Sequence, residues 1–517
     1  MLDIYFILLL TVMIKNRDFI MMMMMYKTIM MVNNKAVSGG LEWRVRVADG
    51  SSSAVLVPES GIFERIWQGI IGLVFGIIRK VRNFFAKAWD VGVDDPRKIM
   101  HCLKVGVALT VVSLFYYMRP LYQGVGGNAM WAVLTVVVIF EYTVGATLCK
   151  SLNRATGTFL AGALAVGVHW VASQSGERFE PIILRSSVFI LATSATFSRF
   201  IPVVKARFDY GAMIFILTFS LVAISGYRVD NLFNLAQERL STIVIGGSMC
   251  LLVSMFICPI WAGQDLHFLV ARNMEKMANS LDGCVAEYFK DSESDEESRK
   301  NFQGYKCVLN SKATEEALAN FARWEPAHGN FSFRHPWKQY LKIGASLRSC
   351  AYCIEALNGC INSEILAPEF IKEHLSGVST RLASHSSTVL KELAHITKTM
   401  RRSSTLDFAI EDMKSAVEDL HDALKSLPSQ LEVDEKKTDP ITQPTSIPLI
   451  EVLPLITASS LMVEITTRIE RTIVVVNELA SLAKFKPVKD KKTKQSKVTN
   501  KNRPDQGQDT IKTLQMV

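Results

Sequence analysis

The chain has 517 residues, of which 49% are hydrophobic, and it carries a formal net charge of +9. Its mean hydropathy is +0.20, whereas soluble proteins of this length rarely average above zero, so the composition argues against a wholly soluble protein. The nine cysteines lack the spacing of a secreted disulfide framework, which argues against an extracellular domain held by disulfide bonds.

The region that precedes the first apolar stretch, residues 1–95, is predicted to be cytosolic. Its first 14 residues are apolar but too few to span a bilayer comfortably, and no positively charged segment precedes them. A run of methionines follows at 21–25. We interpret residues 1–36 as an extension upstream of the true start, with Met30 or Met31 as the initiator, and a weak signal anchor is the alternative.

Six apolar stretches follow, each close to the length that crosses about 30 Å of hydrocarbon as a helix. Helices are favoured because every backbone polar group in a bilayer must be paired internally. The fourth stretch carries Arg185 near one end, which makes it the weakest of the six predicted spans. We therefore predict an all-α membrane protein whose transmembrane domain covers residues 96–262, with six helices near 102–118, 129–147, 155–173, 182–198, 211–226 and 241–262.

The placement of lysine and arginine predicts the orientation of these helices, since basic residues are enriched in cytoplasmic segments. One set of flanking segments is richer in basic residues than the other, and this places both termini in the cytosol. The richer set carries Arg79, Lys80, Arg82, Lys87, Arg97, Lys98, Lys104, Lys150, Arg154, Arg199, Lys205 and Arg207. The opposite set carries Arg119, Arg178, Arg185, Arg228 and Arg239.

The pattern changes after residue 262 to mixed polar and apolar positions with helical periodicity, which predicts a cytosolic helical domain over 263–485. A polar, proline-containing linker is expected near 427–448. The apolar helix expected at 449–483 is interrupted by charges, so we predict that it packs on the helical domain instead of forming a seventh span. The basic tail, 486–517, is predicted to be disordered.

Several long segments resemble a known family. They are GGNAMWAVLTVVVIFEYTVGATLCKSLNRATGT, ATFSRFIPVVKARFDYGAMIFILTFSLVAISGYRVD, ERLSTIVIGG, CPIWAGQDLH and VLNSKATEEALANFARWEPAHGNFSFRHPWKQYLKIGA. In this order they resemble the aluminium-activated malate transporters, which are plant anion channels, over roughly 90–425 and more weakly near 454–486. The resemblance implies a homodimer with six membrane helices per subunit, a helical cytosolic domain and a gated path for malate and other anions.

Candidate anion-binding residues follow from the charge of malate, a dianion at neutral pH. Arginine suits a carboxylate because its planar fork donates two hydrogen bonds and stays charged. Lys150 and Arg154 share one face if their junction is helical. Arg154 and Arg239 also match basic positions that the resemblance places in the pore, and Lys104 is a further candidate. The competing interpretation for all four is anchoring at the membrane interface.

Three further residues inside the apolar stretches have two interpretations each. Glu141 is an acidic residue well inside a predicted span, where ionisable groups are commonly functional. It either relays protons or forms an ion pair with a nearby basic residue, which we favour. Trp131 and Phe219 either narrow the pore or pack between helices, and packing is the favoured interpretation.

The segment Trp324, Glu325 and Pro326 matches the Trp-Glu-Pro motif of the family. We predict a structural role, in which Pro326 ends a helix, Trp324 packs, and Glu325 caps a helix or pairs with a neighbour such as Arg323 or Arg334. The RRSST segment at Arg401–Thr405 is a possible kinase site.

Binding of aluminium is not expected, because a hard trivalent cation needs several oxygen ligands on the outer face. The outer loops carry few acids: Asp230 is accompanied by Asn231 and Asn234, and Glu177 and Glu180 flank Arg178. We predict no metal site, no cofactor and no catalytic residue, since the chain lacks P-loop, HExxH and GxSxG motifs.

Two alternatives to an anion channel stay open at this point. One is a proton-coupled exporter of aromatic or organic acids like the fusaric-acid-resistance proteins, and the other is a non-conducting membrane scaffold. Nucleic acid is not an expected partner, because the basic residues cluster at membrane flanks and in the tail. We expect a multi-pass protein of the lipid bilayer, in the plasma membrane rather than the vacuolar membrane.

Overall fold

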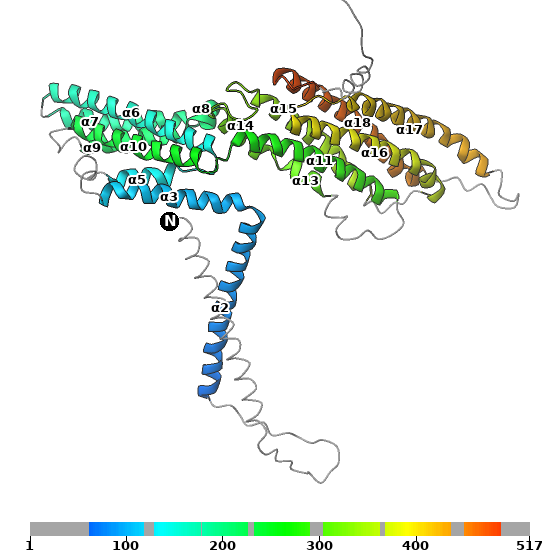
Figure 1. Ribbon diagram of the computed structural model, residues 1–517, viewed down its shortest axis with the longest axis horizontal. Coiled ribbons are helices and arrows are strands. Elements are labelled where there is room, and N and C mark those ends of the chain that lie inside the picture. Colours follow the sequence, from blue (N-terminus) through cyan, green and yellow to red (C-terminus); the bar gives the residue numbers. More distant parts are fainter. Residues whose placement is uncertain are drawn as a thin grey trace, which may run out of the picture. The chain divides into compact units, whose positions relative to one another are not determined.

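The computed structural model describes residues 62–117, 129–176, 178–225, 232–289, 303–361, 368–435 and 449–487. Within these ranges the chain is helical and contains no strand, which confirms the predicted all-α class (Figure 1). The predictions for residues 1–36 and for the tail beyond residue 487 lie outside the described residues. The chain divides into two units, Met1–Asp94 and Asp95–Val517.

The described part of the first unit is one 33-residue helix, α2, at Ile62–Asp94. The second unit begins with helices that occupy each of the six predicted apolar stretches in turn. They are α3 (Pro96–Tyr117), α5 (Ala129–Ile139), α6 (Val144–Gln174), α7 (Glu180–Ser198), α9 (Asp209–Ser225) and α10 (Leu232–Phe256), with the short α8 (Pro202–Arg207) before α9.

Four helices in the described ranges are long and apolar enough to cross a membrane. Three of them lie in this first group, at Val144–Gln174, Glu180–Ser198 and Arg239–Phe256. The helices α5 and α9 are apolar but shorter. The count of six spans is therefore a prediction, although each predicted stretch is helical.

The predicted boundary between the second and third stretches is wrong. The second was expected to continue to residue 147, but α5 ends at Ile139 and α6 begins at Val144. The cause is the side chain of Thr143, which accepts a hydrogen bond from the backbone N–H of Ala146 at 3.3 Å and caps the new helix. Lys150 and Arg154 consequently lie inside α6 and not in a loop.

The predicted end of the sixth stretch is also wrong, since α10 stops at Phe256 and not at residue 262. Pro259 disfavours helical backbone at the residue before it, and Cys258 there has a φ of 43°. The chain then turns, and the Ile260 carbonyl accepts a 2.9 Å hydrogen bond from the N–H of Val144 at the start of α6.

Small residues let the helices of this group approach closely, as is common in membrane proteins. The helices α6 and α9 meet at Gly157, where an added Cβ would lie 2.7 Å from the Gly211 carbonyl oxygen. Asn153 supports this contact by donating a 3.1 Å hydrogen bond to the carbonyl of Arg207, the last residue of α8, just before α9. Together these contacts hold the α6 face that carries Arg154 against α9.

Seven helices follow in the part of the chain that the structure describes: α11 (Ala262–Phe289), α13 (Gly304–Leu309), α14 (Lys312–Ala322), α15 (Trp337–Ile361), α16 (Glu369–Thr399), α17 (Thr405–Glu435) and α18 (Leu449–Leu482). One hydrophobic core joins them. The start of the predicted linker is too early, because α17 continues to Glu435; good helix formers such as Gln430 and Glu432 follow Pro428. Residues 436–448 lie outside the described residues.

The helix α18 is the fourth helix that qualifies as a membrane span by length and composition. It nevertheless places Leu455, Ile465, Ile469 and Val476 in the core of the C-terminal helices, where each is almost fully buried. Arg468 on the same helix donates to the Ser349 carbonyl of α15 at 3.3 Å. These contacts confirm the prediction that this helix packs back on the C-terminal bundle.

Candidate functional site

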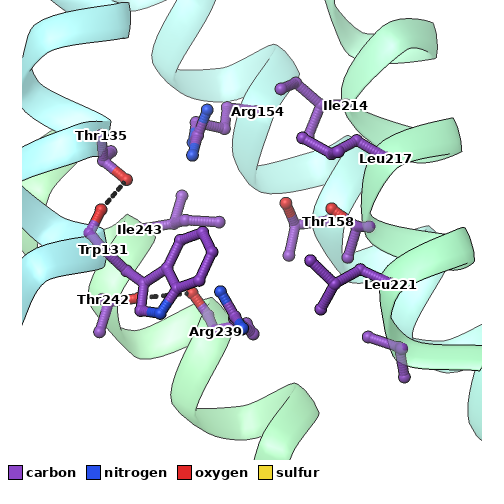
Figure 2. Close-up of a pocket in the computed structure, with 12 residues that line it drawn as sticks. Trp131, Thr135, Arg154, Thr158, Ile214, Leu217, Leu221, Arg239, Thr242 and Ile243 are labelled. Carbon is purple, nitrogen blue, oxygen red and sulfur yellow. Dashed lines mark hydrogen bonds between the residues drawn. The ribbon is translucent and has the colours of Figure 1, made fainter. Parts of the chain in front are cut away.

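A cavity of about 50 Å³ lies between α5, α6, α9 and α10. It is lined by two arginines, one tryptophan, four threonines and aliphatic side chains, several of which Figure 2 shows. The lining residues are Trp131, Thr135, Arg154, Thr158, Ile214, Leu217, Thr218, Leu221, Val222, Arg239, Thr242 and Ile243. The described atoms thus form a pocket that carries positive charge and hydroxyl groups within otherwise apolar helices.

Arg154 reaches the cavity from α6 and is only 7% exposed. Its Nη1 donates a 3.1 Å hydrogen bond to the hydroxyl of Tyr210, at the start of α9. Its Nε has no hydrogen-bond partner among the described residues. A buried guanidinium group with an unused donor is costly unless water or an anion completes its hydrogen bonds.

Arg239 approaches the same cavity from α10 and stacks on Trp131 of α5. The guanidinium carbon lies 3.5 Å from the centre of the indole ring, a cation–π arrangement. Figure 2 shows Arg239 and Trp131 together on one side of the cavity and Arg154 on the other. The two arginines predicted as pore residues from separate stretches therefore line one cavity, and Trp131 lines it with them.

Threonine hydroxyls supplement the two guanidinium groups. Thr158 is one helical turn after Arg154, is 3% exposed, and its hydroxyl has no hydrogen-bond partner among the described residues. Thr242 is close to Arg239 in sequence and donates to the Arg239 carbonyl at 2.9 Å. Analysis of the sequence missed both threonines and Tyr210, although their i+4 and i+3 spacing from the arginines could have indicated Thr158 and Thr242.

Lys150 lies outside the cavity and forms an ion pair with Glu141. Its ammonium group also lies 5.7 Å from the centre of the Tyr210 ring. Glu141 lies between α5 and α6, and not inside a helix as the prediction of a span there had it. Since Tyr210 of α9 bonds Arg154 as well, a continuous chain of contacts runs from Glu141 through Lys150 and Tyr210 to Arg154. Glu141 thus has a basic partner, the arrangement that we favoured over proton relay.

Lys104 and Phe219 do not line the cavity. Lys104 of α3 is 1% exposed and donates a 2.7 Å hydrogen bond to the carbonyl of Cys258, beyond the end of α10. Phe219 of α9 is buried in a cluster with Ala161 and Ala165 of α6. The geometry favours a packing role for Phe219 over a pore-narrowing role.

A second set of contacts connects α6 to the C-terminal helices through Glu325. This carboxylate is 3% exposed and accepts hydrogen bonds from the backbone N–H groups of Gly145 (3.3 Å), Ala262 (2.6 Å) and Gly263 (3.0 Å). Gly145 belongs to the first turn of α6, and Ala262 and Gly263 to the first turn of α11. One side chain therefore caps two helix N-termini, where unpaired donors and the helix dipole favour a carboxylate.

The backbone around Glu325 is packed too tightly for larger residues at the capped positions. A Cβ added at Gly145 would lie 2.5 Å from the Phe321 carbonyl oxygen. Trp324 is half-buried, and the helix α14 has already ended at Ala322 before Pro326 is reached. The expected capping by Glu325 involves distant helices, not Arg323 or Arg334, and Pro326 is not the residue at which the helix stops.

Burial raises the pKa of Glu325 to about 7, although its three backbone donors act in the opposite direction. The nearby carboxylate of Asp265 raises the pKa slightly further. His328 lies 4.0 Å away, and burial lowers the pKa of its ring, so it is mainly neutral at neutral pH. Glu325 therefore titrates within the physiological range.

Among the described residues, no group of three or more His, Cys, Asp or Glu side chains could hold a metal ion. Of the acids discussed for aluminium, Asp230 and Glu177 lie outside the described residues. Glu180 is the first residue of α7.

Comparison with known proteins places the chain in a family. Residues 89–441 match the family described as aluminium activated malate transporter. Aluminum-activated malate transporter 10 of Arabidopsis thaliana is 53% identical over 88% of this chain and 97% of the relative. Transporter 2 of the same plant is 47% identical, over 79% of this chain and 80% of the relative, and transporter 1 of Triticum aestivum is 40% identical, over 81% and 90%. The chain belongs to the aluminium-activated malate transporter family.

Proposed function

We propose that this membrane protein transports malate and other anions passively, through a gated path that includes the cavity between α5, α6, α9 and α10. The family and the names of the relatives support malate transport across a membrane. The observation that carries the proposed path is the presence of Arg154 and Arg239 in one cavity. The hydroxyl of Thr158, which has no hydrogen-bond partner within the described ranges, lies in the same cavity between apolar walls.

The chemistry of this cavity suits a dicarboxylate that must enter and leave. Each guanidinium group can replace part of the hydration of one carboxylate, and the threonine hydroxyls can donate to the remaining oxygens. Two cationic groups repel each other while the cavity is empty, and an entering dianion relieves that repulsion. Attraction of this kind does not depend on very tight binding. Conduction requires such modest affinity, because the anion must also leave the site.

The length of α6 supports a position of Arg154 near the membrane boundary. A helix of 31 residues is about 46 Å long, whereas the hydrocarbon core is about 30 Å thick. If the C-terminal end of α6 lies at one boundary of the hydrocarbon, the first ten residues of the helix extend beyond the opposite boundary. Arg154 is the eleventh residue of α6 and therefore lies at that opposite boundary. An arginine there is tolerated more easily than at the centre of the bilayer.

We further propose six spans per subunit, a homodimer, and cytosolic positions for both termini and for the helices after α10. A two-fold axis would present Arg154 and Arg239 twice around a shared path. The plasma membrane is proposed as the location, and a fluorescent fusion of the full chain tests it. Phosphorylation of the RRSST segment, which follows α16 and ends at the first residue of α17, is a further proposal that rests on its sequence.

Passive conduction can be separated from proton coupling by the reversal potential. A dianion gains roughly 4.6 kcal/mol by leaving a cell held near −100 mV, so efflux requires no coupled ion. We expect currents in oocytes or liposomes to reverse with the anion gradient at every imposed pH gradient. We also expect Glu141→Gln to retain transport, because Glu141 is paired with Lys150.

The coupled exporter would be supported if the reversal potential followed the proton gradient and Glu141→Gln abolished transport with normal membrane expression. A complete lack of anion current would support a non-conducting scaffold. The family match favours neither alternative. The family is named for transport and not for catalysis, which agrees with the prediction that the protein is not an enzyme.

External aluminium is expected to change the malate current by less than about two-fold, because a hard trivalent cation needs several carboxylate ligands. The segment after α9 carries Asp230, but Asn231 follows it in the sequence and Asn234 belongs to the first turn of α10. The measurement is the malate current before and after addition of micromolar aluminium at acid pH. A several-fold rise, lost in Asp230→Asn, would contradict this prediction.

A further inference from the structure

The helix α2 exposes a long row of large apolar side chains. Leu73, Phe84 and Val93 are 65%, 68% and 65% exposed, respectively. From residue 70 onward, where the side chains of this helix are described, the other large exposed apolar residues are Ile70, Ile71, Val74, Ile77, Val81, Phe85, Trp89 and Val91. Exposed apolar surface on this scale requires a covering partner.

Most of these apolar side chains share one face of α2, and the basic ones lie along its edges or opposite it. Ile70, Val74, Ile77, Val81 and Phe84 follow the spacing of three and four residues that aligns side chains along a helix. On the same period, Arg79 falls on the opposite side, and Lys80, Arg82 and Lys87 fall along the two edges of the apolar face. All four basic residues are exposed. From Ile70 to Trp89 the sequence contains no acidic residue.

The position of α2 in the chain points to a lipid surface as the partner. Only Asp95 separates the end of α2 from α3, the first helix of the proposed transmembrane domain. The end of α2 must therefore be close to the boundary of the bilayer. A transmembrane placement of α2 is disfavoured, since Arg79, Lys80 and Arg82 would then lie within the hydrocarbon.

We propose that α2 lies in the plane of the membrane interface, with its apolar face among the lipid acyl chains and its basic residues at the phosphates of anionic lipids. Its amphipathic pattern, exposed aromatic rings and lysine and arginine content are those of interfacial helices. The phosphates of anionic headgroups complement Arg79, Lys80, Arg82 and Lys87. This inference rests on the proposed membrane location but not on conduction.

Photo-crosslinking in the full-length protein tests this inference, with two adjacent positions as a matched pair. Phe84 lies on the apolar face and Asn83 on the polar face of α2. Each is replaced in turn by the photoreactive residue p-benzoylphenylalanine, and the protein is reconstituted in phosphatidylcholine vesicles with or without phosphatidylserine. We expect lipid adducts, detected by mass spectrometry, at position 84 and several-fold fewer at position 83.

The charge requirement is tested with the combined variant Arg79→Gln, Lys80→Gln and Arg82→Gln. Each lysine or arginine near an anionic membrane surface strengthens the binding of its segment to that surface by about five-fold. The additional crosslinking that phosphatidylserine produces should therefore fall by at least that factor in the variant. Crosslinking in pure phosphatidylcholine should not change. An unaltered response to phosphatidylserine would overturn the assignment of anionic lipid.

Two other results would overturn the interfacial placement. Protein adducts at position 84, to a second copy or to another segment, would show that protein covers the apolar face. Equal lipid labelling at positions 83 and 84 would show that the two faces of α2 are not distinguished. Anion flux is measured in the same vesicles, and loss of flux with lipid adducts retained at position 84 would count against conduction alone.

Discussion

Replacement of Arg154 or Arg239 by alanine is expected to cut malate conductance and to weaken selectivity for anions over cations, while membrane expression is retained. A hydrogen bond to a charged group is worth about 1.5–3 kcal/mol, so each loss should weaken anion binding roughly 10- to 150-fold. Both side chains line the same cavity, and the double variant should therefore lose less than the product of the single effects. The measurement is current under symmetric anion substitution.

Controls distinguish the shape of the guanidinium group from its charge. Arg154→Lys should rescue conductance only in part, because it keeps the charge and loses the planar fork. Arg185 is an arginine on α7 that does not line the cavity, and Arg185→Ala should conduct like the parent. If Arg154→Ala and Arg239→Ala both behave like Arg185→Ala, the path lies on another face, and Lys104 and Lys150 become the next candidates.

The helical class and the order of the apolar helices could be predicted from the sequence because hydropathy is a local property. The exact helix ends could not, since they depend on single contacts such as the Thr143 side chain at Ala146. The same holds for α10, which ends early because Pro259 constrains Cys258. The charges that interrupt the stretch at 449–483 also indicated that α18 packs on other helices, although its length and composition suit a membrane span.

The candidate site was predicted in part. Arg154 and Arg239 were identified by charge and by resemblance, but only the structure brings them into one cavity from α6 and α10. Tyr210 was not predicted, because its bond to Arg154 joins helices that are distant in sequence. The exposed apolar face of α2 was also missed, although the three- and four-residue spacing after Ile70 was present in the sequence.

Glu325→Ala is expected to loosen the first turns of α6 and α11. The alanine would leave the backbone N–H groups of Gly145, Ala262 and Gly263 without their acceptor. Each buried donor that loses its partner costs about 1–3 kcal/mol, so a loss of several kcal/mol is expected unless water enters. Since α6 carries Arg154, the anion current should change as well.

Hydrogen exchange at these three amides measures the effect directly, and thermal unfolding in detergent measures it globally. Glu316 is a suitable control, because it is an exposed carboxylate on α14. Glu316→Ala should leave both measurements unchanged. If Glu325→Ala preserves the protection of Gly145 and Gly263, the carboxylate does not hold the two helix ends.

The pH dependence of the same contact has a definite sign. The pKa of Glu325 is about 7, above the ordinary value for glutamate, so the folded protein binds a proton that the unfolded chain has lost. This contribution to stability is fully present below the unfolded pKa and is lost as the pH rises through 7. Between pH 6 and pH 8 the parent should lose about 1.3 kcal/mol of stability from this group.

Glu325→Gln keeps a neutral acceptor and should abolish this loss, whereas Glu316→Gln should retain it. Both helix ends depend on the carboxyl group of Glu325. The anion current of the parent should therefore also change when the pH is varied from 6 to 8 on the side of the membrane where the C-terminal helices lie. That part of the pH response should be absent in Glu325→Gln. If the parent and Glu325→Gln respond identically in stability and in current, the proton is bound elsewhere, and Glu325 serves only as a fixed cap of α6 and α11.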